Sequence, residues 1–88
     1  MANKKKVGDI THFFDKISVA IIKVVKSQKI KVGDTLHYKN KKGTVDFAEK
    51  IESMQIFKEQ VETAKAGEEV GVKVGQKIGE GVEVFLAQ

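Results

Sequence analysis

Two histidines and a few carboxylates are the side chains of this 88-residue sequence that could take part in catalysis. His12 and His37 stand far apart in the chain, and a metal site would need further ligands beside them. Asp9 and Asp15 could lie close across a predicted hairpin and exchange protons, although turns and pairing with lysine are commoner roles. Cysteine is absent, which excludes thiolate chemistry. The sequence therefore predicts neither a catalytic nor a metal site, and a protein that is not an enzyme.

Phosphate binding by glycine-rich loops is a second kind of chemistry. The pattern G-x-x-x-x-G-K-[ST], whose amides and lysine bind nucleotide phosphates, occurs nowhere in the chain, so GTP binding is not expected. Gly71, Gly75 and Gly79 are evenly spaced but lack the strand-to-helix setting of a dinucleotide-binding loop. We assign these glycines to turns or close packing and expect no cofactor.

The chain has 16 lysines and no arginine, and most of the lysines lie in the first part of the chain. Residues 1–50 contain 12 lysines and 5 acidic residues, whereas residues 51–88 contain 4 lysines and 7 acidic residues. Without arginine, bidentate recognition of bases is not expected. Weak, salt-sensitive RNA binding is predicted for Lys23, Lys26, Lys29, Lys31, Lys39, Lys41 and Lys42. A solvated, lysine-rich surface is the alternative.

Phe13 and Phe14 are adjacent aromatic residues on a predicted strand. Successive side chains of a strand point to opposite faces, so one ring should join the core and the other should be at least partly exposed. An exposed ring could anchor a partner protein or stack on a base, while covering the end of a barrel is the alternative. Both residues are therefore candidate partner-binding residues.

Short strands separated by turns are the elements that must position these residues. Val70, Val72 and Val74 alternate with other residues, which is typical of a strand with one buried face. Residues 58–65 are predicted to form a helical turn that buries Val61 and Ala64. The predicted strands are 7–13, 17–25, 35–39, one beginning near 44, 70–74 and 82–86, with turns at 32–34, 40–43 and 66–67. A bulge, a bend or a new strand is expected near 48–52.

The fold class that this pattern predicts is all-β, with a six-stranded closed antiparallel barrel. Closure is expected because it removes exposed strand edges. Residues 1–6 are predicted to be a flexible, lysine-rich tail, and residues 7–88 a single barrel domain. The longest apolar stretch, 17–25, is shorter than the roughly 20 residues of a membrane-spanning helix, so no membrane partner is expected. The absence of cysteine fits a cytoplasmic protein.

The segment 51–72 begins with Ile-Glu-Ser-Met-Gln, a strand pattern in which an apolar residue, any residue, Ser, an apolar residue and Gln follow one another. A connector and the pattern Ala-x-x-Gly-x-x-Val-Gly come after it. The last pattern is formed by Ala64, Gly67, Val70 and Gly71. This arrangement, with the turns at 30–34 and 78–81, resembles domain II of translational GTPases, nearest to elongation factor Tu. The resemblance covers most of residues 7–87 and implies a six-stranded antiparallel barrel in a stand-alone, elongation-factor-like protein.

The resemblance also implies a binding role. In elongation factor Tu, a Glu and an Arg before the connector help to form the pocket for the aminoacyl end of tRNA, and Gln55 and Lys58 match these positions. Gln55 and Lys58 are therefore candidate partner-binding residues. The implied function is a non-catalytic adaptor that docks on a protein or a ribonucleoprotein. Because the same barrel type occurs as a tail domain on some peptidases, an accessory module of a peptidase-type enzyme, acting in trans, is the alternative.

Overall fold

Short β-strands are the regular elements of this fold. The computed structural model describes residues 5–57, 59–79 and 81–86, and within these ranges it contains strands and turns but no helix. No described residue belongs to a helix that could cross a membrane. The strands are β1 (Lys5–Phe14), β2 (Val19–Val24), β3 (Lys29–Lys31), β4 (Thr35–Lys39), β5 (Asp46–Lys50), β6 (Met54–Ile56), β7 (Glu59–Val61), β8 (Thr63–Lys65), β9 (Glu69–Lys73) and β10 (Glu83–Leu86).

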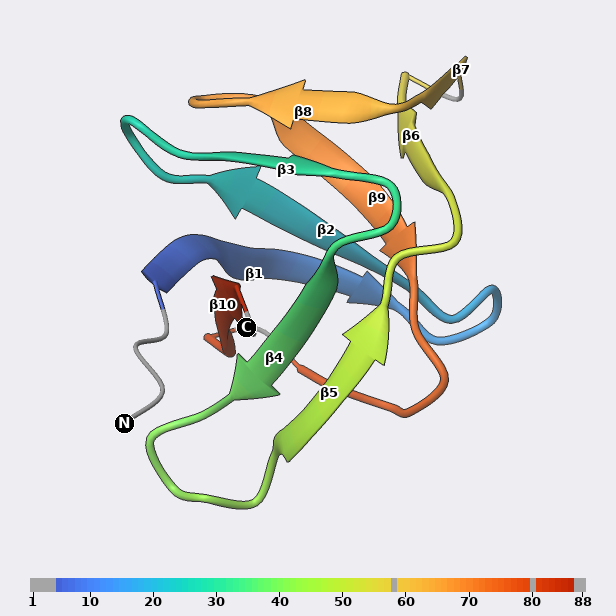
Figure 1. Cartoon of the computed structure of the whole chain (residues 1–88). Helices are drawn as coiled ribbons and strands as arrows, with labels where there is room; N and C mark the ends of the chain where they lie inside the picture. The colour runs from blue at the N-terminus through green and yellow to red at the C-terminus, as the bar shows by residue number, and fades with distance from the viewer. Residues whose placement is uncertain (1–4, 58, 80, 87–88) are drawn as a thin grey trace.

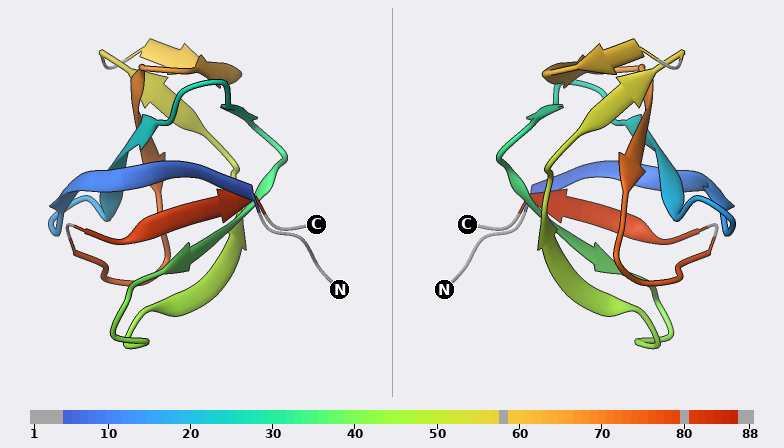
Figure 2. Two further views of the ribbon diagram at one scale, coloured as in Figure 1. Left: turned by 90° about the vertical axis from the view of Figure 1, so that its left-hand side faces the viewer. Right: turned by 90° about the vertical axis from the view of Figure 1, so that its right-hand side faces the viewer.

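Eight of the strands form one antiparallel sheet with the order β5-β4-β10-β1-β2-β9-β6-β7. β3 and β8 pair with each other and form a separate two-stranded sheet near the top of the view in Figure 1. The large sheet curls round on itself, as the two side views in Figure 2 show. It remains open, because β5 and β7 are its two edges and do not pair with each other.

The prediction of an all-β antiparallel fold is confirmed, whereas the prediction of a closed six-stranded barrel is wrong. Closure was expected to protect the strand edges, but here the edges are protected by other means. β7 has only three residues, and β5 carries Asp46, Glu49 and Lys50. Short or charged edge strands resist pairing with other chains without a barrel. Glu49 also accepts the Gly75 N–H with both carboxylate oxygens, each at 3.0 Å, which ties β5 to the segment after β9.

Two residues of the predicted N-terminal tail belong to a strand. Lys5 and Lys6 belong to β1 and pair with β10, while residues 1–4 lie outside the described part of the chain. The Lys6 ammonium lies 2.9 Å from the Asp9 carboxylate and 3.0 Å from that of Glu83. Hydrogen bonds to Asp9 and then to Glu83 raise the pKa of Lys6 above its ordinary value. Strand pairing and this charge cluster therefore hold the start of β1 against β10.

The hairpin of β1 and β2 fixes the direction in which the adjacent phenylalanines face. Phe13 lies opposite Ala20, and Phe14 lies opposite Val19. Ala20 is fully buried, and Phe13 packs against the core on the same side of the sheet. Phe14 points to the other face and is 44% exposed. The prediction that the two rings face opposite ways is confirmed.

Alternation along the strands builds the core. Every second residue of β2 from Ala20 to Val24 is buried, and in β9 Val70 and Val72 are buried in the same way. Tyr38 of β4 is 1% exposed and is one of the largest buried side chains. Burial of a large aliphatic or aromatic side chain stabilises a fold by roughly 1.5–3 kcal/mol. The inner face of the curled sheet thus supplies the stability of this chain without disulfides.

Residues 59–61 and 63–65 form two short strands instead of the predicted helical turn. β7 pairs with β6, and Ala64 in β8 lies opposite Ile30 in β3. Ala64 and Ile30 are both fully buried, whereas Val61 is half-buried against the core. A single helical turn gains little from its local hydrogen bonds, so the buried cross-strand contact determines the conformation.

The predicted turns at 32–34, 40–43 and 66–67 are confirmed. Gly33 and Gly67 adopt φ angles of 100° and 84°, which L-residues with a side chain rarely adopt. The Asp34 carboxylate accepts the Lys31 N–H at 3.0 Å and closes the first turn. The irregularity expected near 48–52 is observed at 51–53, which separates β5 from β6, whereas residues 48–50 belong to β5.

Candidate functional site

An apolar strip crosses the outer face of the sheet, away from the core. The strip runs across four neighbouring strands. Phe14 lies opposite Val19 in the β1–β2 pair, Ile21 lies opposite Gly71 in the β2–β9 pair, and Gly71 lies opposite Gln55 in the β9–β6 pair. Residues opposite each other in antiparallel strands point to the same face. Their neighbours in β2 and β9, such as the buried residues described above, point inward. We call Phe14, Val19, Ile21, Gly71 and Gln55 the outer strip.

Gly71 keeps the outer strip close to the backbone of β9. A Cβ at this position would stand 3.2 Å from Cγ1 of Val19 and 3.5 Å from Cδ1 of Ile21. The side chains of Val19 and Ile21 therefore occupy the space over β9 that a side chain at position 71 would need. The result is a shallow apolar surface on the open side of the sheet.

Phe57 stands beside the outer strip, in the turn between β6 and β7. Its side chain is 95% exposed, more than any other large apolar residue among those described. A hollow of about 460 Å³ lies next to it. We call this the Phe57 hollow; its lining residues are Ile21, Ile56, Phe57, Gly67, Glu68 and Glu69. Since Ile21 belongs to both, the hollow continues the outer strip.

Two of the four predicted partner-binding residues lie on the same face of the sheet. Gln55 and Phe14 both lie on the outer strip, although on different strands. Phe13 points to the opposite side and packs against the core. Lys58 lies outside the described residues. A partner-binding role for these residues stays a prediction, and of the pair of adjacent phenylalanines only Phe14 lies on this face.

Phe57 is the candidate that sequence reasoning missed. The sequence itself offers only a large apolar residue directly followed by lysine. The turn is recognisable only through the pairing of Ile56 with Glu59 in β6 and β7. Because the local pattern of residues 58–65 favoured a helical turn, that hairpin was not predicted.

The seven lysines predicted to bind RNA are all exposed, but they form two groups. Lys23, Lys26, Lys29 and Lys31 belong to β2, the turn after it, and β3, whereas Lys39, Lys41 and Lys42 belong to the end of the β4–β5 hairpin. This hairpin end and β3 lie at opposite ends of the molecule in Figures 1 and 2. The lysines therefore do not make one continuous track, and RNA binding stays a prediction.

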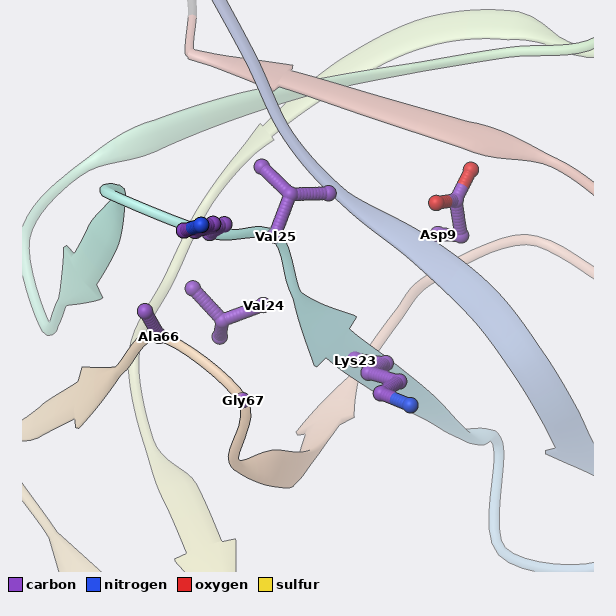
Figure 3. Close-up of a pocket in the computed structure, with 7 residues that line it drawn as sticks. Asp9, Lys23, Val24, Val25, Ala66 and Gly67 are labelled. Atoms are coloured by element: carbon purple, nitrogen blue, oxygen red, sulfur yellow. The ribbon is translucent and has the colours of Figure 1, made fainter.

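Lys23 and Lys26 line a second hollow, of about 510 Å³, between the end of β2 and the turn after β8 (Figure 3). Asp9 of β1 lies opposite Lys23 and lines the same hollow. The Gly67 N–H donates to the Val24 carbonyl at 2.9 Å, so this part of the backbone is already hydrogen-bonded. The hollow combines lysines with a carboxylate and does not present charge of a single sign.

The side chains considered for acid–base chemistry make local contacts. His37 bonds Asp46 across the β4–β5 pair. The ring of His12 packs edge-on against Phe14, with ring centroids 4.5 Å apart. Among the residues that the structure describes, no group of three or more His, Cys, Asp or Glu side chains is placed to hold a metal ion. These contacts orient the strands and the outer strip.

Solved structures with a similar fold come from a putative peptidase. Two crystal structures of the C-terminal domain of a putative U32 peptidase from Geobacillus thermoleovorans match this chain with TM-scores of 0.82 and 0.85. The matches cover 91% and 96% of this chain and 96% and 93% of the two domains. The sequence identity is 13% in both. The likeness therefore establishes a shared all-β fold.

A similarity in sequence points in the same direction. An uncharacterized protease of Methanocaldococcus jannaschii is 40% identical to this chain over 84 residues, which is 94% of the chain. The match covers 20% of the protease, so the chain spans about a fifth of the length of this curated relative. No protein-family model matches the chain.

These findings overturn the predicted kinship with domain II of elongation factors. That resemblance rested largely on Gly67, Val70 and Gly71. In the structure, Gly67 forms a left-handed turn, Val70 is buried and Gly71 lies on the outer face of a strand. Many small antiparallel sheets need a turn glycine, a buried valine and a strand glycine, so the pattern is not specific to one family. The description of this chain as translation-factor-like is wrong.

Proposed function

We propose that this domain is a non-catalytic accessory module of a peptidase-type enzyme, which binds the catalytic part of that enzyme through the outer strip. The observation that carries the proposal is the 40% identity with a protease across 94% of this chain. At this level of identity over a whole small domain, a related role is the natural inference. The fold match to a domain of a putative U32 peptidase supports it independently.

Polar side chains in this domain make structural contacts, which supports a binding role rather than catalysis. Glu49 accepts a backbone N–H from the segment after β9, and Asp34 closes a turn. Lys6 bridges two carboxylates at the start of β1. These groups stabilise the sheet, whereas the outer strip offers apolar surface that the domain itself leaves open.

The adaptor for a ribonucleoprotein is the weaker interpretation. Its main argument was the resemblance to translation factors, which the comparisons contradict. Its remaining support is the lysine-rich surface, and exposed lysines are common on soluble domains. Weak RNA binding would need only phosphate contacts and would not by itself define a function.

A direct test uses the Methanocaldococcus jannaschii protease from which the segment matching this chain has been deleted. We expect this chain to bind the truncated protease at a one-to-one ratio in a calorimetric titration, with a dissociation constant of about 1–100 μM. Moderate affinity is enough, because a tethered module acts at an effective concentration near millimolar.

The intact protease provides the matched control. Its own segment should occupy the docking surface, so it should bind this chain much more weakly than the truncated form. Absence of saturable binding to the truncated protease, or equal binding to both forms, would contradict the proposed function.

A further inference from the structure

Two features of Phe57 contribute nothing to the stability of the folded chain. Its backbone φ angle is 52°, in the left-handed region that bulky residues rarely adopt. Its side chain is 95% exposed, so the aromatic ring gains almost no burial in return. Strained backbone and exposed apolar surface at one residue are typical of a functional contact.

The hairpin itself does not require phenylalanine at this position. Ile56 lies opposite Glu59, so two residues connect β6 to β7. Two-residue connections of this kind favour positive φ angles and usually carry Asn-Gly or Asp-Gly. Asparagine would fit the Phe57 backbone better and would expose no ring. Stability of the hairpin therefore does not explain the residue, whereas contact with another molecule does.

The Phe57 hollow is apolar at its wall and acidic at its rim. Ile21 and Ile56 are half-buried and line the hollow, Ile56 also packs against the core, and Glu68 and Glu69 supply two carboxylates. The Glu68 carboxylate accepts a backbone N–H of β8 at 2.6 Å, which fixes its position. None of the lysines that the structure describes lines this hollow, although the chain carries a net charge of +4. Among the described residues, Glu68 and Glu69 are thus the charged residues that line the hollow, and Lys23 lies opposite Glu69 on the neighbouring strand β2.

We infer that the Phe57 hollow docks a protein segment that presents an apolar side chain next to a lysine or arginine. The apolar side chain packs against Phe57 and Ile21, and the cation faces Glu68 and Glu69. A second copy of this chain fits less well, because a two-fold contact would bring the same glutamates together. The identity of the partner as a peptidase rests on the proposed function, whereas the chemistry of the surface does not.

A titration with two synthetic peptides tests this chemistry. The probes are acetylated, amidated pentapeptides, Gly-Lys-Leu-Lys-Gly and Gly-Glu-Leu-Glu-Gly, followed by methyl and amide NMR spectra of the chain. The basic peptide should shift the signals of Ile21, Ile56 and Phe57 at millimolar concentration, and the acidic peptide should not. Equal shifts with both peptides, no shift with either, or shifts confined to other residues would overturn the inference.

A pair of variants tests the same surface against the truncated protease described above. Phe57→Asn should lower the affinity about 30-fold, as expected for an aromatic anchor, while the melting temperature stays equal or rises. The control is Ile17→Asn, which removes another exposed apolar side chain, 59% exposed, from the β1–β2 turn and should leave the affinity unchanged.

The two proposals fail in different ways. If the wild-type chain binds the truncated protease and Phe57→Asn binds equally well, the docking surface is wrong and the proposed function stands. If the wild-type chain does not bind the truncated protease but the basic peptide shifts the NMR signals of the Phe57 hollow, the proposed function is wrong and the inferred docking chemistry of the hollow is supported.

Discussion

At the scale of single residues, Tyr38 shows how burial changes the chemistry of a side chain in this fold. It is the chain's only tyrosine, is 1% exposed and stacks on Phe47 with ring centroids 5.0 Å apart. Burial raises the pKa of the Tyr38 phenol, and the nearby Glu49 carboxylate raises that pKa further. Both effects disfavour the phenolate. The folded chain therefore holds a proton that the unfolded chain releases at about pH 10.

This difference predicts how stability responds to alkali. Below about pH 10 both states keep the phenol proton, and the contribution of Tyr38 is fully present. Above that pH only the unfolded state loses the proton, so the free energy of unfolding should fall by about 1.4 kcal/mol per pH unit until the folded pKa is reached. Tyrosinate absorbance should appear together with the loss of the circular dichroism signal of the folded chain.

The variant Tyr38→Phe is the control for the lysines, which also titrate in alkali. Its stability should fall less steeply above pH 10 than that of the wild type. Tyrosinate absorbance near pH 10 in a chain that is still folded would show that Tyr38 is not protected.

Single residues also show how far sequence reasoning reached at the candidate site. The opposite orientations of Phe13 and Phe14 followed from strand geometry alone. Gln55 was selected through a family resemblance that proved wrong, yet it lies on the same face as Phe14. The exposure of Phe57 depends on a hairpin register that links β6 to β7, and side-chain type does not reveal such a register.

At the scale of elements, the backbones of β1 and β2 leave no room for a side chain at Gly8. A Cβ there would stand 2.5 Å from Cγ2 of Ile22 and 2.9 Å from the backbone carbonyl oxygen of Lys23. A side-chain methyl group can rotate away, but a carbonyl group fixed in a sheet cannot. The pairing of the two central strands therefore requires glycine at this position.

We predict that Gly8→Ala destabilises the chain by about 1–3 kcal/mol, the usual cost of overpacking. Gly79→Ala is the matched control, since apart from its chain neighbours no atom of the described residues lies within 4 Å of the place that its Cβ would take, and its φ angle is not in the left-handed region. The control should change stability by less than about 0.5 kcal/mol. Urea unfolding of both variants measures the difference, and equal midpoints would refute the close approach of β1 and β2.

The elements that sequence predicted well are those with a local signal. Alternating valines predicted β9, and the Gly33 and Gly67 turns followed from residue type. The segment 58–65 failed because its local pattern allowed a helical turn. Its strand conformation depends on the pairing of Ala64 with Ile30, which lies far from it in the sequence, and no local pattern carries that contact.

At the scale of the whole molecule, strand order is the feature that sequence could not supply. Neighbours such as β10 and β4, or β2 and β9, are far apart in the chain, and their pairing depends on the complete packing of the core. Alternation predicts that a strand has a buried face but does not say which strand lies beside it. The all-β class was therefore predictable, whereas the open, curled sheet and the separate β3–β8 pair were not.

The distribution of charge over the molecule bears on function at the same scale. The lysine groups at β3 and at the β4–β5 hairpin lie at opposite ends of the molecule, while the Phe57 hollow carries Glu68 and Glu69. If the Phe57 hollow docks a basic partner segment, as inferred above, Glu68 and Glu69 provide the complementary charge there. This arrangement accounts for a protein-docking module more directly than for an RNA-binding one.

Hydrogen–deuterium exchange of this chain, alone and with the truncated Methanocaldococcus jannaschii protease, tests the central claim most directly. The account predicts slower exchange in the β6–β7 hairpin and in the turn that leads into β9, where the Phe57 hollow lies, and unchanged exchange at the end of the β4–β5 hairpin. Unchanged exchange throughout the chain, or protection confined to the β4–β5 hairpin, would contradict it.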